Sequence, residues 1–272
     1  MSGQPTETAW LKVASVTALV LSGAFGACVK KTDGPSVRLG VTAGPHAQLA
    51  SEVARLAATR GLNVTVVEFN DYVQPNLALA DKSLDVNSFQ HRPYLEQQSR
   101  ARGYEFEAIG TTVTFPIAAY SQSVKQLKDV PENATVAIPN DPTNAARALR
   151  LLEREGLLRL SPDAGLEATV NDVTWTKGTL ALKELDAAQL PRALPDVSVA
   201  VINTNYALEA GLDPVGGSLA REAPDGPYAN LLVVRRGDAQ RPELQRLAEL
   251  YHSAEVRAFI ESTFKGAVVP AW

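Results

Sequence analysis

The sequence predicts an α/β protein, because segments with the pattern of strands alternate along the chain with segments that have the pattern of helices. The first group is a strand at 37–41, a helix at 47–60 and a second strand at 62–69. The helix is indicated by apolar residues at helical spacing and by Gly61, which follows as a C-terminal cap. A strand, a helix and a strand in this order predict a βαβ unit with parallel strands and a right-handed crossover.

The alternation continues toward the end of the chain. Further strands are expected at 135–138, 197–202 and 230–235, and further helices at 142–155 and 242–263. The helix at 142 has a strong start signal, since aspartate at 141 caps free N–H groups and proline at 142 suits the first turn. Ligands of open α/β sheets bind beyond the carboxyl ends of the strands, so the loops there are where we expect a site.

Composition restricts the classes of partner. The chain has 272 residues, a net charge of −4 and 45% apolar residues, which suits one large domain or two of ordinary size. No basic stripe is present, so we expect no nucleic-acid partner.

Cys28, the only cysteine, follows an apolar run at 13–27. A helix that spans a bilayer needs about 20 apolar residues, so this shorter run suits a signal peptide better. With the small residues Gly26 and Ala27 before the cysteine, it predicts a lipoprotein signal peptide at 1–27, a lipid on Cys28 and a polar tether at 28–35. The alternative is an N-terminal helix with a buried free thiol.

Four rings occur close together in a chain that is only 6% aromatic: Tyr72, Phe89, His91 and Tyr94. They lie in the segments 70–76 and 85–94, which we expect to be polar loops, and this composition is typical of a small-molecule pocket. Ordinary core packing is the competing interpretation for Phe89 and Tyr94.

Arg147 would lie within two turns of the start of the helix expected at 142. There the helix dipole and the forked guanidinium could converge on one carboxylate. The alternative is a solvated basic stripe, because Arg150 and Arg154 follow at helical spacing.

Asn203 and Asn230 each stand at one end of an expected strand. Since a carboxamide both donates and accepts, the two could orient the ammonium and carboxylate of an amino acid. A simple role in turns competes with this. His46, in the turn at 42–46, is open to the same two interpretations: an anion site at a helix start or a plain capped turn.

Enzyme motifs are missing from the sequence. There is no Gly-x-Ser-x-Gly, no His-Glu-x-x-His and no phosphate loop, and the three histidines lack metal-ligand spacing, so we expect no metal and no cofactor. An acid–base pair of His91 with an aspartate at 71, 85 or 141 is the enzyme alternative.

Six strings resemble the methionine-binding lipoproteins of the MetQ/NlpA type, in order and at suitable spacing; they stand at 40–46, 71–76, 139–144, 189–192, 201–206 and 264–270. The resemblance implies a two-lobed periplasmic-binding-protein fold of type II-like architecture, with the ligand in a cleft between the lobes. Lobe 1 would comprise 36–113 and 231–272, and lobe 2 would comprise 114–230. The chain would cross near 114–120 and return near 228–234.

The resemblance also implies roles for the candidate residues. Tyr72, Phe89, His91 and Tyr94 would surround a methionine side chain, Arg147 would bind the carboxylate, and Asn203 and Asn230 would hold the backbone polar groups. A ring cluster suits a thioether, since each sulfur–aromatic contact contributes roughly 0.3–1.5 kcal/mol.

The function implied is capture of methionine at the periplasmic side of the cell envelope and its delivery to an ABC permease and ATPase. The ligand would be L-methionine, with D-methionine and methionine-containing peptides as variants known in the family. The protein would be a monomer, held to the membrane by the lipid on Cys28, and it would perform no chemistry. An adhesion or signalling lipoprotein with the same fold is the alternative.

Overall fold

A computed structural model of the chain describes residues 34–176, 178 and 180–272. Cys28 and the signal peptide predicted at 1–27 lie outside these residues. Within them, no helix is long and apolar enough to cross a membrane.

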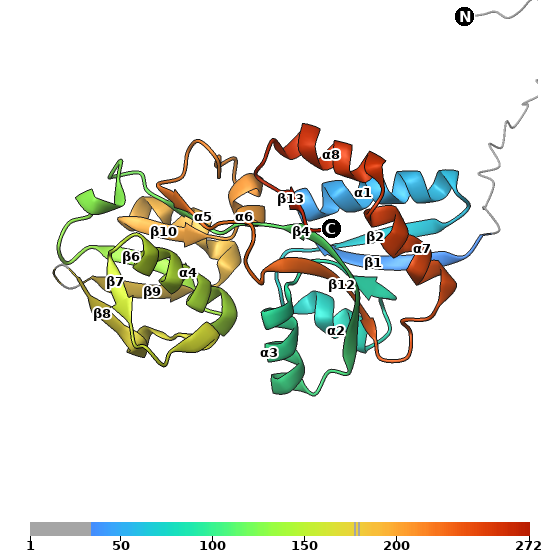
Figure 1. The fold of residues 1–272 in the computed structure, drawn as a ribbon, viewed down its shortest axis with the longest axis horizontal. Helices are drawn as coiled ribbons and strands as arrows, with labels where there is room; N and C mark the ends of the chain where they lie inside the picture. Colours follow the sequence, from blue (N-terminus) through green and yellow to red (C-terminus); the bar gives the residue numbers. More distant parts are fainter. Residues whose placement is uncertain (1–33, 177, 179) are drawn as a thin grey trace, which may run out of the picture. The chain divides into compact units, whose positions relative to one another are not determined.

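Strands and helices alternate through the described residues, as the sequence predicts (Figure 1). The α-helices are α1 (Pro45–Thr59), α2 (Gln74–Ala80), α3 (Arg92–Arg102), α4 (Pro142–Arg154), α5 (Leu190–Ala193), α6 (Thr204–Glu209), α7 (Pro242–Tyr251) and α8 (Ala254–Phe264). The strands are β1 (Ser36–Thr42), β2 (Asn63–Phe69), β3 (Val86–Asn87), β4 (Phe106–Thr114), β5 (Ala118–Tyr120), β6 (Thr135–Pro139), β7 (Leu158–Leu160), β8 (Val173–Trp175), β9 (Ala181–Leu185), β10 (Val199–Ile202), β11 (Ala220–Arg221), β12 (Ala229–Arg235) and β13 (Val269–Pro270).

The strands form two main sheets, one in each lobe. A six-stranded sheet has the order β13-β4-β12-β3-β1-β2, and a five-stranded sheet has the order β11-β5-β10-β6-β9, while β7 and β8 form a separate pair. The expected parallel pairing of β1 with β2 is confirmed, although β12 runs antiparallel to β3 and β4. The chain leaves the first sheet after β4 and returns to it after β11, so 115–117 and 222–228 connect the lobes.

The core of the first lobe lies between β1 and the helices α1, α7 and α8. Leu49, Val53 and Leu56 of α1 are buried at helical spacing against Leu39 and Val41 of β1. Gly61 takes a left-handed backbone, with φ of 74°, just past the end of α1, as expected of a C-terminal glycine.

The core of the second lobe lies between α4 and the strands β6 and β10. Leu149 and Leu152 of α4 have no exposed surface and pack with Val136 and Ile138 of β6. The predicted start of α4 is confirmed, because the Asp141 carboxylate accepts a hydrogen bond from the backbone N–H of Asn144 at 3.0 Å.

Two expectations about the secondary structure are wrong. The helix expected at 242–263 is two helices, because the Ser253 hydroxyl accepts a hydrogen bond from the N–H of Val256 at 3.3 Å and starts α8. The segments at 70–76 and 85–94 are not simply loops, since they contribute to α2, β3 and α3. Only Tyr94 and Leu95 of α3 are buried, so its sequence lacks an extended apolar period.

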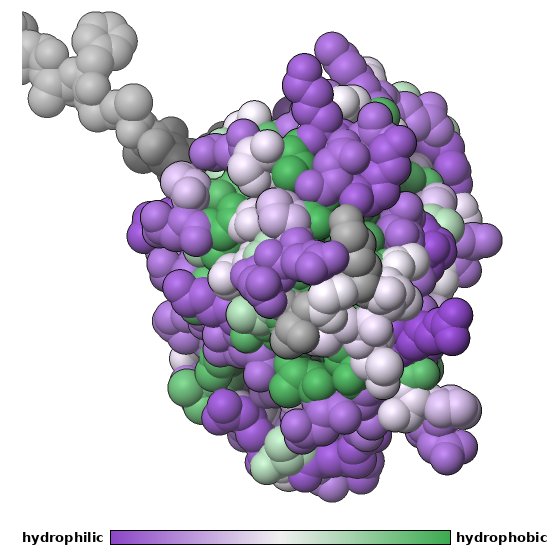
Figure 2. Space-filling view, turned by 90° about the vertical axis from the view of Figure 1, so that its left-hand side faces the viewer, coloured by the Kyte–Doolittle hydropathy of each residue, from purple (hydrophilic) through white to green (hydrophobic). Residues whose placement is uncertain are grey.

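Figure 2 shows the left-hand side of Figure 1, which is the side of the five-stranded sheet. Hydrophilic side chains dominate it, and apolar side chains appear as separate patches between them. Such a mixture is usual for a solvated surface.

Gly40 of β1 brings the backbone close to its neighbours. A Cβ added there would lie 2.2 Å from Cδ1 of Leu84 and 3.2 Å from Cε2 of Phe69. The Gly40 carbonyl accepts a hydrogen bond from the N–H of Ser88 at 2.9 Å, so this contact also sets the position of the segment that carries Phe89.

We expect Gly40→Ala to lower the free energy of unfolding by about 1–3 kcal/mol, the usual cost of overpacking a core. Denaturant unfolding measures this. Gly110→Ala in β4 is the matched control, because a Cβ there meets its nearest atom, in His252, at an ordinary 3.6 Å. Equal stability of the two variants would contradict the prediction.

Candidate functional site

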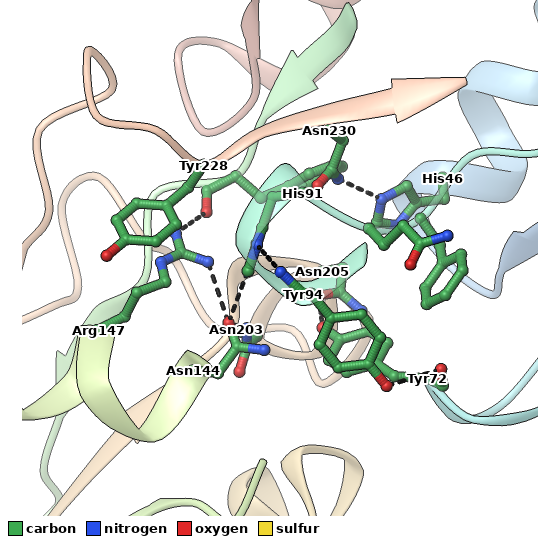
Figure 3. Close-up of a pocket in the computed structure, with 13 residues that line it drawn as sticks. His46, Tyr72, His91, Tyr94, Asn144, Arg147, Asn203, Asn205, Tyr228 and Asn230 are labelled. Carbon is green, nitrogen blue, oxygen red and sulfur yellow. Dashed lines mark hydrogen bonds between the residues drawn. The ribbon is translucent and has the colours of Figure 1, made fainter. Parts of the chain in front are cut away.

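A cavity lies where residues of both lobes meet (Figure 3). All seven residues predicted for the site line it. The complete lining is His46, Tyr72, Phe89, Gln90, His91, Tyr94, Phe115, Asn144, Arg147, Asn203, Asn205, Tyr228 and Asn230.

Three of the four predicted rings form one cluster. The ring centroids of Tyr72, Phe89 and Tyr94 are each 6.0 Å from one another, and those of His91 and Tyr94 are 6.2 Å apart. Phe89 and Tyr94 are buried, so they are core residues and cavity-lining residues at once. Tyr206 extends the cluster from the second lobe, with its centroid 5.1 Å from that of Tyr72.

A buried network of amides lies beneath the ring cluster. Asn76 and Gln90 exchange two hydrogen bonds of 2.8 and 2.7 Å, and Asn87 donates to Asn76 at 3.0 Å. The network satisfies these polar groups and fixes the chain on both sides of Phe89. It joins α2, β3 and the residues after β3.

His91 is a neutral ring with one assigned tautomer. Its Nδ1 accepts the N–H of Tyr94 at 3.2 Å, so Nε2 carries the proton and donates to Oδ1 of Asn144 at 3.2 Å. Burial, helped by the Arg147 charge, lowers the pKa of His91 to about 3. This side chain of the first lobe therefore contacts the second lobe as an uncharged donor.

His46 is neutral for the same reason, since burial lowers its pKa to about 3. Its Nε2 accepts from Nδ2 of Asn230 at 2.9 Å, so Nδ1 donates to the Thr42 hydroxyl at 2.7 Å. Because Nδ2 of Asn230 is directed to His46, the carboxamide oxygen of Asn230 is the group left for the cavity (Figure 3).

Arg147 is 3% exposed and does not belong to a solvated stripe, whereas Arg150 is half-buried and Arg154 is exposed. Its Nη1 donates to Oδ1 of Asn144 at 3.2 Å, and its guanidinium lies over the Tyr228 ring at 4.2 Å from the centroid (Figure 3). The alternative of a basic surface stripe is therefore wrong for Arg147.

The fork of Arg147 is already occupied. Nε donates to Oε1 of Glu222 at 3.2 Å, Nη2 donates to Oε2 of the same carboxylate, and Nη2 also donates to the Phe115 carbonyl at 3.0 Å. Only Nη1 has a hydrogen left for a further acceptor. A ligand carboxylate would meet one N–H of Arg147 here rather than the whole fork.

Two amides present unpaired polar atoms within the cavity. Asn203 donates from Nδ2 to Oδ1 of Asn144 at 3.0 Å, but its own Oδ1 has no partner among the described residues. Asn205 accepts the Tyr72 hydroxyl at 2.6 Å, while its Nδ2 has no partner there. Buried polar atoms are normally paired, so one free acceptor and one free donor indicate where a polar ligand would bind.

The aspartates of the enzyme alternative are engaged elsewhere. Asp85 pairs with Arg38 and Arg241, and Asp71 accepts N–H groups at the start of α2. Asp141 caps α4, and both of its carboxylate oxygens accept from Nδ2 of Asn144. Burial raises the pKa of Asp141. Among the described residues, no group of histidine, cysteine and carboxylate side chains could hold a metal ion.

Sequence reasoning did not assign several lining residues, above all Asn144, Asn205 and Tyr228. Asn144 and Asn205 stand in strings that carry the resemblance, and Tyr228 lies two residues before Asn230, so their closeness in sequence to predicted site residues was the available signal. Glu222 had no such signal, because its partner lies far away in the sequence.

Known proteins resemble the chain over most of its length. A relative from Vibrio cholerae serotype O1, named probable D-methionine-binding lipoprotein MetQ, is 41% identical over 95% of this chain and 96% of its own. A nutrient-binding protein from Burkholderia cenocepacia, solved bound to methionine, is 47% identical, with a TM-score of 0.85 over 87% of this chain and all of its own. A periplasmic substrate-binding protein of an ABC transporter from Coxiella burnetii is 43% identical, with a TM-score of 0.84 over 86% of this chain and all of its own.

The sequence model of the NlpA lipoprotein family matches residues 37–272, which include both sheets and the complete lining of the cavity. The two-lobed α/β fold expected from the sequence is confirmed by the solved structures of similar proteins. On this match, and on the relatives that share two fifths of its sequence, the chain belongs to the NlpA lipoprotein family.

Proposed function

We propose that the protein is an extracytoplasmic substrate-binding lipoprotein that captures methionine and delivers it to an ABC transporter without chemical change. The observation that carries this proposal is one cavity that combines a ring cluster with unpaired amide groups and a buried arginine. The names of the relatives support it, since they include a methionine-bound protein and an ABC transporter component.

The ring cluster suits the side chain of methionine. Tyr72, Phe89 and Tyr94 form an aromatic part of the cavity lining, against which a thioether sulfur would gain roughly 0.3–1.5 kcal/mol for each aromatic contact. The hydroxyls of both tyrosines are directed away into hydrogen bonds, Tyr72 to Asn205 and Tyr94 to the carbonyl of Tyr72. These rings therefore offer their carbon faces to the ligand.

The polar groups suit the two charges of an amino acid. Nη1 of Arg147 and Nδ2 of Asn205 are donors for a carboxylate, while Oδ1 of Asn203 and Oδ1 of Asn230 are acceptors for an ammonium. The carboxylate would thus meet two donors, and the ammonium would meet two acceptors. A ligand with both charges satisfies all four groups.

Direct contacts also hold the lobes together around the cavity. Tyr72 of the first lobe donates to Asn205 of the second, and His91 of the first donates to Asn144 of the second. Closure of this kind hides both ends of a ligand and presents a surface that a permease can distinguish from the open form.

The proposal includes the location. A lipid on Cys28 would hold a monomer at the membrane on the periplasmic side, near its permease, with the lobes at 36–113 plus 231–272 and at 114–230. L-methionine is the proposed ligand, and D-methionine and methionine-containing peptides are to be compared with it, since relatives are named for D-methionine.

We expect calorimetric titration of ligand-stripped protein with L-methionine to show saturable binding at one site, and no heat at millimolar ligand would exclude this ligand.

Asn203→Ala should weaken binding about tenfold or more, because it removes a buried partner of the ligand. Asn140→Ala is the matched control: Asn140 also follows a parallel strand of the second sheet, but it is exposed. Equal losses in the two variants would contradict the role of Asn203.

Methionine affinity should stay nearly constant between about pH 5.5 and pH 7, although a histidine of ordinary pKa titrates near 6.5. His46 and His91 have pKa values lowered to about 3 and stay neutral over this interval. Titrations at both pH values measure the effect. A fall in affinity of about tenfold at the lower pH would contradict this prediction.

Cys28→Ser should release the protein from membranes, because no other cysteine can carry the lipid. Fractionation of cells that express the variant and the wild type measures this, with methionine binding by the soluble variant as the control for folding. Continued association of the variant with membranes would contradict the anchor.

A further inference from the structure

The Arg147–Glu222 ion pair joins a residue that lines the cavity, Arg147, to a carboxylate outside the lining, Glu222. The Arg147 side chain is 3% exposed and the Glu222 side chain is 16% exposed, so water screens this pair little. Both carboxylate oxygens of Glu222 accept from the guanidinium, one from Nε at 3.2 Å and the other from Nη2. The positive charge at the cavity is thus matched by a negative charge of the protein itself.

Glu222 is held in place by the two connections between the lobes. It lies in the connection at 222–228, and its N–H donates to the Ile117 carbonyl of the other connection at 2.9 Å. The N–H of Ile117 donates in turn to Oε2 of Glu222 at 3.3 Å. Hydrogen bonds from the backbone and from Arg147 thus fix the position of the Glu222 carboxylate in this structure.

Among the lining residues of the cavity, only Arg147 carries a charge, and Glu222 is its counter-ion. His46 and His91 are neutral, and no lysine, aspartate or glutamate is among the lining residues. Asp141, a further carboxylate that contacts a lining residue, accepts from the backbone N–H and the side-chain Nδ2 of Asn144. Removal of the Glu222 charge would leave Arg147 without its counter-ion.

We propose that Glu222 is a specificity-determining residue, which makes the site select zwitterionic amino acids over net-anionic derivatives whose amino group is acylated. A zwitterion carries an ammonium whose attraction to Glu222 offsets the repulsion between Glu222 and the ligand carboxylate. An N-acylated ligand has the same carboxylate and no ammonium, so the repulsion remains. This inference rests on the proposed function, because it concerns the same site.

The test compares L-methionine with N-acetyl-L-methionine by calorimetry, in the wild type and in Glu222→Gln. We expect the ratio of the two dissociation constants to shift toward N-acetyl-L-methionine by about tenfold in the variant, since one buried unit charge is removed near the ligand carboxylate. The steric effect of the acetyl group cancels, because it is present in both proteins. Glu184→Gln, an exposed carboxylate on β9 of the same lobe, is the matched control and should leave the ratio unchanged.

An equal ratio in Glu222→Gln and wild type overturns the inference, and so does a failure of the variant to bind N-acetyl-L-methionine. If the wild type gives no heat with L-methionine, it is the proposed function that fails. If Glu222→Gln does not fold, a second pair of proteins provides the same comparison. The variant R147M and the double variant R147M/E222Q also differ only in the charge of Glu222. The same tenfold shift is expected between them, and equal ratios in that pair overturn the inference.

Discussion

The site depends on the orientation of one carboxamide, that of Asn144. Its Nδ2 donates to both carboxylate oxygens of Asp141, at 3.1 and 2.9 Å, so its Oδ1 must face the other way. There it accepts from His91, Arg147 and Asn203. One aspartate that caps a helix therefore determines where three cavity-lining groups direct their hydrogens. Since His91 belongs to the first lobe, the same carboxamide also connects the lobes.

This arrangement explains why the histidines are uncharged. Three donors already surround Oδ1 of Asn144, and a second proton on His91 would add a buried charge close to the Arg147 guanidinium. His46 has a donor on one nitrogen and a hydroxyl on the other, which satisfies a neutral ring completely. The cavity therefore keeps one full charge of its own, on Arg147, and the protein compensates it with Glu222.

Local patterns in the sequence allowed much of the fold and of the site to be predicted. The helical period of α1, the Asp141-Pro142 start of α4 and the strands β1, β2, β6 and β12 follow from neighbouring residues alone. The seven predicted lining residues lie beside turns, at strand ends or in the first two turns of a helix, where the fold class places a ligand.

The parts that were missed depend on distant contacts. β3 has two residues and exists because it pairs with β1, and α3 buries only two of its side chains. Glu222 is 75 residues from Arg147, in a segment with no helix or strand pattern, so only the folded chain brings the two together. The sequence accordingly suggested a forked arginine free for a carboxylate, whereas the fold occupies most of that fork.

The unpaired atoms of Asn203 and Asn205 cost stability, because a buried polar atom without a partner is unfavourable by about 1–3 kcal/mol. The apolar packing around them does not require this, since isosteric apolar residues would avoid the cost. A ligand that supplied a donor for Asn203 and an acceptor for Asn205 would remove this cost. Part of its binding free energy would then come from pairing these two atoms. Both side chains lie in the second lobe, where Asn205 accepts directly from Tyr72 of the first lobe and Asn203 shares Asn144 with His91 of the first lobe. Under the proposed function, a ligand that pairs with these amides would therefore also favour contact between the lobes.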